Sequence, residues 1–92
     1  MKRYRFYCGL IDSRGNVVTI LHYTQQMTAK GFTVFETTGY WEGMKEPSIV
    51  IEIICESYEI NPKALAERLR KAGSQAAVLW TEEPITAHLV TR

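Results

Sequence analysis

The segment from Gly31 to Ile54 constrains the fold of this chain more strongly than any other. It contains most of two runs rich in β-branched and aromatic residues, Phe32–Trp41 and Pro47–Glu56. Such residues favour strands. The run between them, Gly39-Tyr40-Trp41-Glu42-Gly43, joins two large rings to two glycines. We therefore expect a β-hairpin whose bend carries the most distinctive surface chemistry of the chain.

The rest of the chain predicts further strands and two helices. Strands are expected over 4–11 and 75–81, with a short fifth strand over 85–90 at an edge of the sheet. The first helix follows the turn at 12–16, with Asn16 or Thr19 as its N-cap and Gly31 as a left-handed C-terminal cap. An alternative is that the β-branched run 17–20 pairs back on the first strand.

The second helix has clearer boundaries. Asn61 is a suitable N-cap, Pro62 falls in the first turn, and Gly73 closes the helix. The resulting order is strand, helix, strand, strand, helix, strand. This order predicts a single α+β domain over 1–92 with the ferredoxin-like split βαβ arrangement, an antiparallel sheet with both helices on one face.

The uncovered face of this sheet is expected to be unusually apolar. It is expected to carry the side chains of Tyr7, Val50 and Ile54. In one of the possible strand registers it also carries Phe35, Trp41, Val78 and Trp80. A slip of one residue in the second strand exchanges Phe35 and Trp41 for Val34 and Tyr40. An apolar face of this kind is normally covered. We therefore expect a homodimer or homotrimer that packs these faces together.

Composition argues against several classes of protein. The formal net charge of +1 gives no electrostatic reason to expect nucleic acid or an anionic membrane as partner. A base-stacking RNA module of this topology needs aromatic residues on the third strand, where this chain has Glu52 and Glu56. No apolar run has the length of a signal peptide or of a membrane span. The two cysteines, Cys8 and Cys55, do not make a disulfide framework. We expect a cytoplasmic protein.

No catalytic or metal-binding motif stands out. The two cysteines and the two histidines, His22 and His88, lack the close spacing of zinc ligands. Ser13 lies on an ordinary polar turn, the pair Glu82-Glu83 lies on an exposed one, and no phosphate-binding loop is present. We therefore expect no enzyme, no metal and no cofactor.

The aromatic tip is the best candidate for a binding site. Tyr40 and Trp41 give large contact areas at low entropic cost, and Glu42 adds a carboxylate. The alternative is that Trp41 packs on the core or on a neighbouring subunit. The candidate set is completed by three residues from the tip and the sheet and by three arginines as anion contacts: Thr38, Glu46, Tyr7, Arg3, Arg5 and Arg70.

Several short motifs resemble a family of small uncharacterised proteins of bacteriophages and mobile elements. They are Cys8-Gly9-Leu10-Ile11, the tip motif 39–43, the run from Glu46 through Ser48 to Ile53, and Gln75 before the last core strand. The resemblance implies a fold similar to PII signalling proteins and the CutA trimers, whose ligand sites lie between subunits. The long loop of PII proteins is missing, so their nucleotide-binding residues cannot be transferred.

The resemblance also implies a function. It suggests a non-enzymatic phage-type accessory protein of the host cytoplasm that inhibits a host defence, by blocking a host protein or by sequestering a nucleotide signal. The first alternative is a PII-like regulatory module that binds a small metabolite at subunit interfaces. The second alternative is a small metal-independent enzyme.

Overall fold

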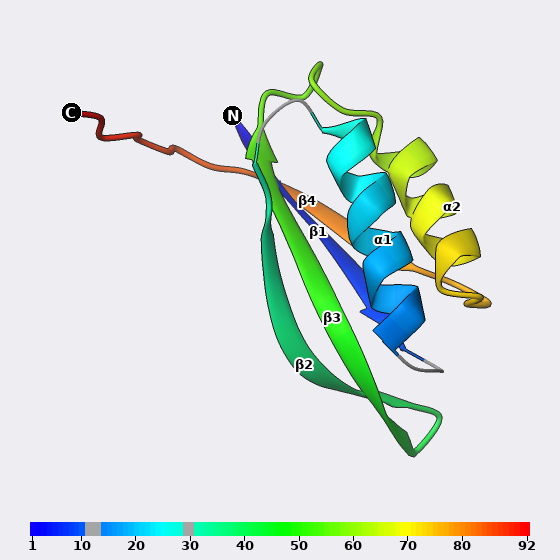
Figure 1. The fold of residues 1–92 in the computed structure, drawn as a ribbon. Helices are drawn as coiled ribbons and strands as arrows, with labels where there is room; N and C mark the ends of the chain where they lie inside the picture. The colour runs from blue at the N-terminus through cyan, green and yellow to red at the C-terminus, as the bar shows by residue number, and fades with distance from the viewer. Residues whose placement is uncertain (11–13, 29–30) are drawn as a thin grey trace.

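Four strands and two helices build one layered domain (Figure 1). The structure, a computed structural model, describes residues 1–10, 14–28 and 31–92, with the backbone alone for 14–16. The elements are β1 (Lys2–Gly9), α1 (Arg14–Met27), β2 (Thr33–Trp41), β3 (Met44–Cys55), α2 (Pro62–Ala72) and β4 (Leu79–Pro84). The sheet has the order β2-β3-β1-β4, and every neighbouring pair is antiparallel. This arrangement confirms the ferredoxin-like fold.

The core lies between the sheet and the two helices. Alternate residues of β1 and β3 face the helices, as the alternation of the sequence predicts. The buried cluster consists of Tyr4, Phe6, Cys8, Ile49, Ile51, Ile53 and Cys55 from the sheet and Ile20, Leu65, Ala66 and Leu69 from the helices. Thr24 is also fully buried, and its hydroxyl donates a hydrogen bond to the Ile20 carbonyl at 2.8 Å. The two central strands therefore supply most of the core.

The opposite face of the sheet has no covering helix, and its residues fall into rows set by the strand register. One apolar row crosses all four strands in the order Phe35, Val50, Tyr7, Leu79. Val50 is only 8% exposed, because its neighbours in the row flank it. Trp41 and Ile54 also lie on this face, as predicted. The prediction that Trp80 and Val78 share this face is wrong, because Trp80 pairs with Phe6 and both pack against the core.

The helix boundaries differ from the predicted ones at three points. Helix α1 begins at Arg14, so Asn16 and Thr19 lie inside it and neither is its N-cap. It ends at Met27, four positions before Gly31, which is therefore not its C-terminal cap. The alternative strand over 17–20 is excluded by the helix. The predicted turn at 12–16 falls partly outside the described residues. In the described part of the chain, no helix is long and apolar enough to cross a membrane.

The last strand also differs from its prediction. β4 begins at Leu79 rather than at Gln75, because residues 73–75 complete the end of α2. It continues to Pro84, so Glu82 and Glu83 pair with β1 and do not lie on the predicted turn. Residues 85–92 form no fifth strand. The pairing with the N-terminal segment continues beyond β4 by a single backbone hydrogen bond, from Ile85 N to the Met1 carbonyl at 3.0 Å. The rest of this segment extends away from the domain (Figure 1).

The β2–β3 hairpin extends beyond the ends of the helices (Figure 1). Trp41 pairs with Met44, and Glu42 and Gly43 form the two-residue bend. Both bend residues have positive φ, 49° for Glu42 and 80° for Gly43. This is the conformation of a type I′ turn, whose twist matches that of the flanking strands. Glycine adopts it without strain, whereas glutamate does not.

We predict that Glu42→Asn stabilises the protein, because asparagine tolerates the left-handed conformation better than glutamate does. The expected gain is about 0.5–1 kcal/mol in the free energy of unfolding, measured by urea denaturation. Glu36→Asn makes the same chemical change within β2 and should give no gain. Equal effects of the two substitutions would show that the bend is not strained.

Candidate functional site

The aromatic tip is fully exposed to solvent. Tyr40, Trp41 and Met44 are 71%, 66% and 72% exposed. The rings of Tyr40 and Trp41 lie on opposite faces of the hairpin, because neighbouring strand residues alternate. Trp41 is therefore no part of the core of its own chain. Thr38 lies on the same face as Tyr40. The tip offers a contact surface but no enclosed ligand site.

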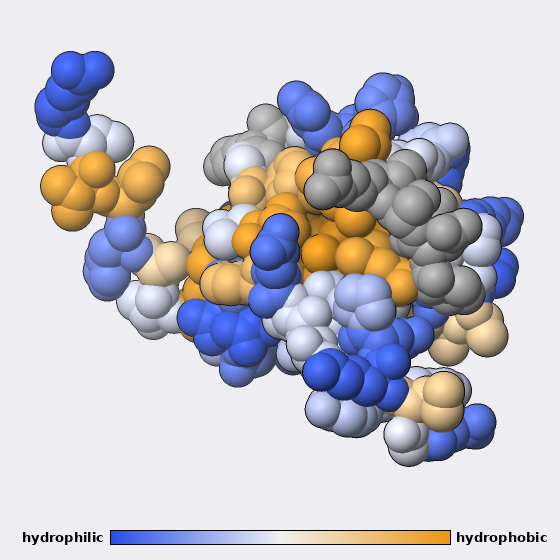
Figure 2. Space-filling view, turned by 60° about the horizontal axis from the view of Figure 1, so that its bottom comes forward, coloured by the Kyte–Doolittle hydropathy of each residue, from blue (hydrophilic) through white to orange (hydrophobic). Residues whose placement is uncertain are grey.

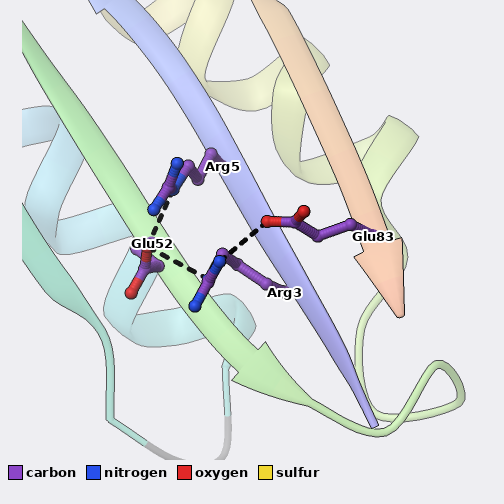
Figure 3. A network of polar contacts seen from close by, with 4 residues as sticks. All are labelled: Arg3, Arg5, Glu52 and Glu83. Carbon is purple, nitrogen blue, oxygen red and sulfur yellow. Dashed lines mark hydrogen bonds and ion pairs between the residues drawn. The ribbon is translucent and has the colours of Figure 1, made fainter. Parts of the chain in front are cut away.

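The three arginines predicted to contact anions are all engaged with carboxylates. Arg3 lies between Glu52 and Glu83, with Nη1 at 2.8 Å from Glu83 Oε1 and Nε at 3.6 Å from Glu52 Oε2 (Figure 3). Arg5 Nε donates to Glu52 Oε2 at 2.8 Å, and this hydrogen bond raises the pKa of Arg5. We call Arg3, Arg5, Glu52 and Glu83 the charged network. An anion here would have to compete with carboxylates already in place.

Arg70 has a structural role at the end of α2. Its Nη2 donates to Glu67 Oε1 at 2.6 Å, and its Nη1 donates to the Gln75 carbonyl at 3.3 Å. The hydrogen bond to Arg70 lowers the pKa of Glu67. Arg70 thus ties the helix to the residue that follows its cap.

A second polar group lies where the ends of three elements meet, and we call it the glycine-floored cluster. Its members are Gly9, Gly39, Glu46, Ser48 and Gln75. Gly9 pairs with Ser48 across β1 and β3, and Gly39 pairs with Glu46 across β2 and β3. A Cβ on Gly9 would collide with Glu46 Oε1 and lie 3.0 Å from Gln75 Oε1. The two side-chain oxygens therefore occupy the space that a side chain at position 9 would fill.

Gln75 owes its position to the way α2 ends. Gly73 N bonds to the Leu69 carbonyl at 2.9 Å, and Gln75 N bonds to the Arg70 carbonyl at 2.9 Å. Ser74, between them, has a positive φ of 52°. These are the features of a Schellman motif, in which Ser74 takes the left-handed position. Gly73 is the C-cap of α2, as predicted. The Gln75 amide nitrogen donates to the Gly73 carbonyl at 3.3 Å, which leaves Oε1 directed at Gly9.

The glycine-floored cluster is chemically suited to a cation or a hydrogen-bond donor. Glu46 Oε1 and Gln75 Oε1 are both acceptors, and within the described part of the chain neither receives a hydrogen bond or an ion pair. Thr37 and Ser48 share a hydrogen bond of 2.5 Å between their hydroxyls beside the cluster.

Cys8 precedes Gly9 in the sequence, but its side chain faces the core, and burial raises the pKa of its thiol to about 12. Cys8 is therefore no nucleophile at neutral pH.

Glu46 was predicted from the sequence, but the residues that it meets in the cluster were not. Gly9, Ser48 and Gln75 appear in the short motifs on which the family resemblance was based, but nothing in the sequence showed that these motifs come together.

Among the described residues, no group of three histidine, cysteine or acidic side chains is arranged to hold a metal ion. His22 is exposed on α1 beside Tyr23, with ring centroids 5.8 Å apart.

No protein-family model and no curated protein matches this sequence. Several solved structures do match. A DUF3240 family protein from Shewanella baltica shares 13% identity over 99% of this chain and 97% of its own, with a TM-score of 0.71. A phage SAM lyase in its apo state shares 19% identity over 89% of this chain and 78% of its own, with a TM-score of 0.66.

A third match is the periplasmic divalent cation tolerance protein CutA from Archaeoglobus fulgidus. It shares 14% identity over 97% of this chain and 88% of its own, with a TM-score of 0.57. At such low identities these matches show the fold alone. They confirm the predicted likeness to the CutA fold, and they show that a phage protein also has it.

We predict that Glu52→Gln destabilises the charged network, because Arg3 and Arg5 then face a neutral amide. Glu52 is only 13% exposed, and the expected fall in melting temperature is about 5 °C. Glu83→Gln serves as the control. Its side chain is 53% exposed, so the loss of its contact to Arg3 should have a much smaller effect. A larger effect of Glu83→Gln would contradict this description of the network.

Proposed function

We propose that this chain is a phage-type protein that acts on S-adenosylmethionine at the glycine-floored cluster, as a lyase. The observation that supports this most directly is the fold shared with a phage SAM lyase over 89% of this chain. The second support is the pair of acceptor oxygens, from Glu46 and Gln75, that the fold brings together at Gly9. A protein that removes S-adenosylmethionine would deprive host defences that depend on methyl transfer.

The chemistry of the ligand fits this cluster. S-adenosylmethionine carries a sulfonium and an ammonium group, both positively charged. A carboxylate and an amide oxygen attract such groups, and the absence of a side chain at Gly9 leaves room for both oxygens beside the backbone. Among the described residues, no lysine or arginine forms an ion pair with Glu46.

The reaction asks little of the protein. The substrate's own carboxylate can attack the carbon that bears the sulfonium, forming a carbon–oxygen bond and closing a lactone. The carbon–sulfur bond breaks with its electron pair on sulfur, and the leaving group is a neutral thioether. It needs no proton from a general acid. The protein has to hold the substrate in a reactive conformation, and positioning of this kind can supply a large part of a rate enhancement. A small site with one carboxylate and no metal meets this requirement.

The second candidate function is the non-enzymatic one, in which the protein inhibits by binding. Its support is the exposed tip, where Trp41 and Met44 form an apolar contact surface on one face of the hairpin and Tyr40 lies on the other. Such residues are typical of binding hot spots. In this second function the tip docks on a host protein. S-adenosylmethionine or another small nucleotide is bound at most, and no reaction follows.

We predict that the protein binds S-adenosylmethionine and consumes it, and that Glu46→Gln lowers turnover by about 10²-fold, because the carboxylate that faces the cation is lost. Binding is measured by isothermal titration calorimetry, and consumption is followed by chromatography of the adenosyl product. Glu36→Gln, which neutralises an exposed carboxylate elsewhere on β2, is the matched control and should leave both unchanged.

A second pair of variants tests the floor of the cluster. Gly9→Ala places a methyl group where Glu46 Oε1 now lies, whereas Gly31→Ala meets nothing within 4 Å. Only the first should weaken binding. Tight binding without consumption would favour sequestration over the lyase, and no binding at all would leave the tip as the functional surface.

A further inference from the structure

Residues 85–92, which we call the arm, lie outside the domain that the rest of the chain forms. Every residue of 86–92 is exposed, and Leu89 and Val90 are 89% and 92% exposed. Figure 2 shows the arm standing clear of the domain, with an apolar segment just before its end. Apart from the bond of Ile85 N to Met1, no described hydrogen bond, ion pair or ring contact joins the arm to the domain.

The composition of the arm is that of a strand without a partner. The sequence Ile85-Thr86-Ala87-His88-Leu89-Val90-Thr91-Arg92 is rich in β-branched residues and contains no glycine or proline. Two large aliphatic side chains in water are costly, since burying each would contribute about 1.5–3 kcal/mol. The arm therefore has the features of a segment that is covered when a partner is present.

The arm is poorly placed to pair with the free edge of its own β2. It continues from β4, and the order β2-β3-β1-β4 puts β4 and β2 at opposite edges of the sheet. To reach β2 it would have to turn back and cross two central strands. Figure 1 shows it running the other way, outward from the domain. A partner strand must therefore come from another molecule.

The outer edge of β2 is the complementary surface. β2 pairs with β3 alone, so every second backbone amide and carbonyl along its nine residues lacks a strand partner. It contains no proline, whereas β4 has only six residues and ends in Pro84. An extended arm of eight residues spans about 26 Å, close to the length of β2. The lengths and the backbone chemistry match.

Charge favours the same pairing. β2 carries one acidic side chain, Glu36, and no basic one, and Glu42 follows it in the bend. The arm carries Arg92 and His88 and no acidic residue. The opposite charges of Glu36 on β2 and Arg92 on the arm attract each other, and alignment of strands at an edge is a common mode of recognition between chains.

We propose that the arm of one copy adds as a fifth strand to the outer edge of β2 in a second copy. The strand expected over 85–90 is then formed between molecules rather than within one. The arm lies beside the β2 residues that lead to Gly39, so a second copy borders the glycine-floored cluster. This proposal does not depend on the identity of the ligand.

The test compares the full chain with a chain that ends after Ile85. Because residues 86–92 contribute no described contact to their own domain, the shortened chain should keep its circular dichroism spectrum and its fold. Light scattering after gel filtration gives the mass of each species, and hydrogen exchange reports protection of the β2 amides. We expect the full chain to be oligomeric with protected β2 amides, and the shortened chain to lose mass and to exchange at least tenfold faster at β2.

Point variants provide a matched pair. Leu89→Asn with Val90→Asn removes the apolar side chains of the arm and should reproduce the effect of shortening. Thr86→Asn with Thr91→Asn makes the same number of changes in the arm and should not. A monomeric full chain, or β2 protection that is unchanged when the arm is removed, would overturn the proposal. An oligomer that persists without the arm but loses β2 protection would support it, since other surfaces then hold the copies together.

Discussion

The antiparallel pairing of β1 with β3 is the interaction on which the other features of this structure depend. These two strands lie in the centre of the sheet and supply most of the buried cluster. Their register, from Lys2 opposite Cys55 to Gly9 opposite Ser48, sets which side chains face the helices. A shift of one residue would expose the isoleucines of β3 and bury Glu52. The hydrophobic core therefore enforces one register.

The difference in length between these strands creates the functional features. β3 has twelve residues and β1 has eight, so the first part of β3 extends past the end of β1 and past the helices. There it can pair only with β2, and the resulting hairpin carries the aromatic tip. Where β1 stops, Glu46 bends over Gly9, and the end of α2 brings Gln75 to the same point. The candidate site thus forms at the place where the central pairing ends.

The sequence predicted the parts of this fold that depend on local patterns. The alternation in β3, the N-cap at Asn61 and the hairpin with an aromatic tip are all visible in neighbouring residues, and the structure confirms them. The third strand was expected to begin at Pro47, but it begins at Met44, so the bend is shortened to Glu42 and Gly43. The start of α1 was predicted wrongly, because several polar residues there are equally suitable caps. The strand over 85–90 was expected at an edge of its own sheet, where the structure has none.

The candidate site was predictable only in part. Glu46 was named from the sequence, but its meeting with Gly9 and Gln75 depends on strand register and on a helix end far away in the chain. The face of Trp80 was assigned wrongly for a similar reason. Short strands in which both faces are partly apolar do not reveal which side is buried. Such long-range relations become visible only when the strands are paired.

The end of β1, the first part of β3 and the end of α2 meet in the glycine-floored cluster, and we propose that this cluster is one ligand site. The most direct test is a titration of the ¹⁵N-labelled protein with S-adenosylmethionine, followed by two-dimensional NMR from the first spectra after mixing. The account predicts that the largest amide shifts fall on Gly9, Gly39, Ser48 and Gln75, with small shifts along the helices. Shifts confined to other parts of the chain, or none at saturating ligand, would contradict it.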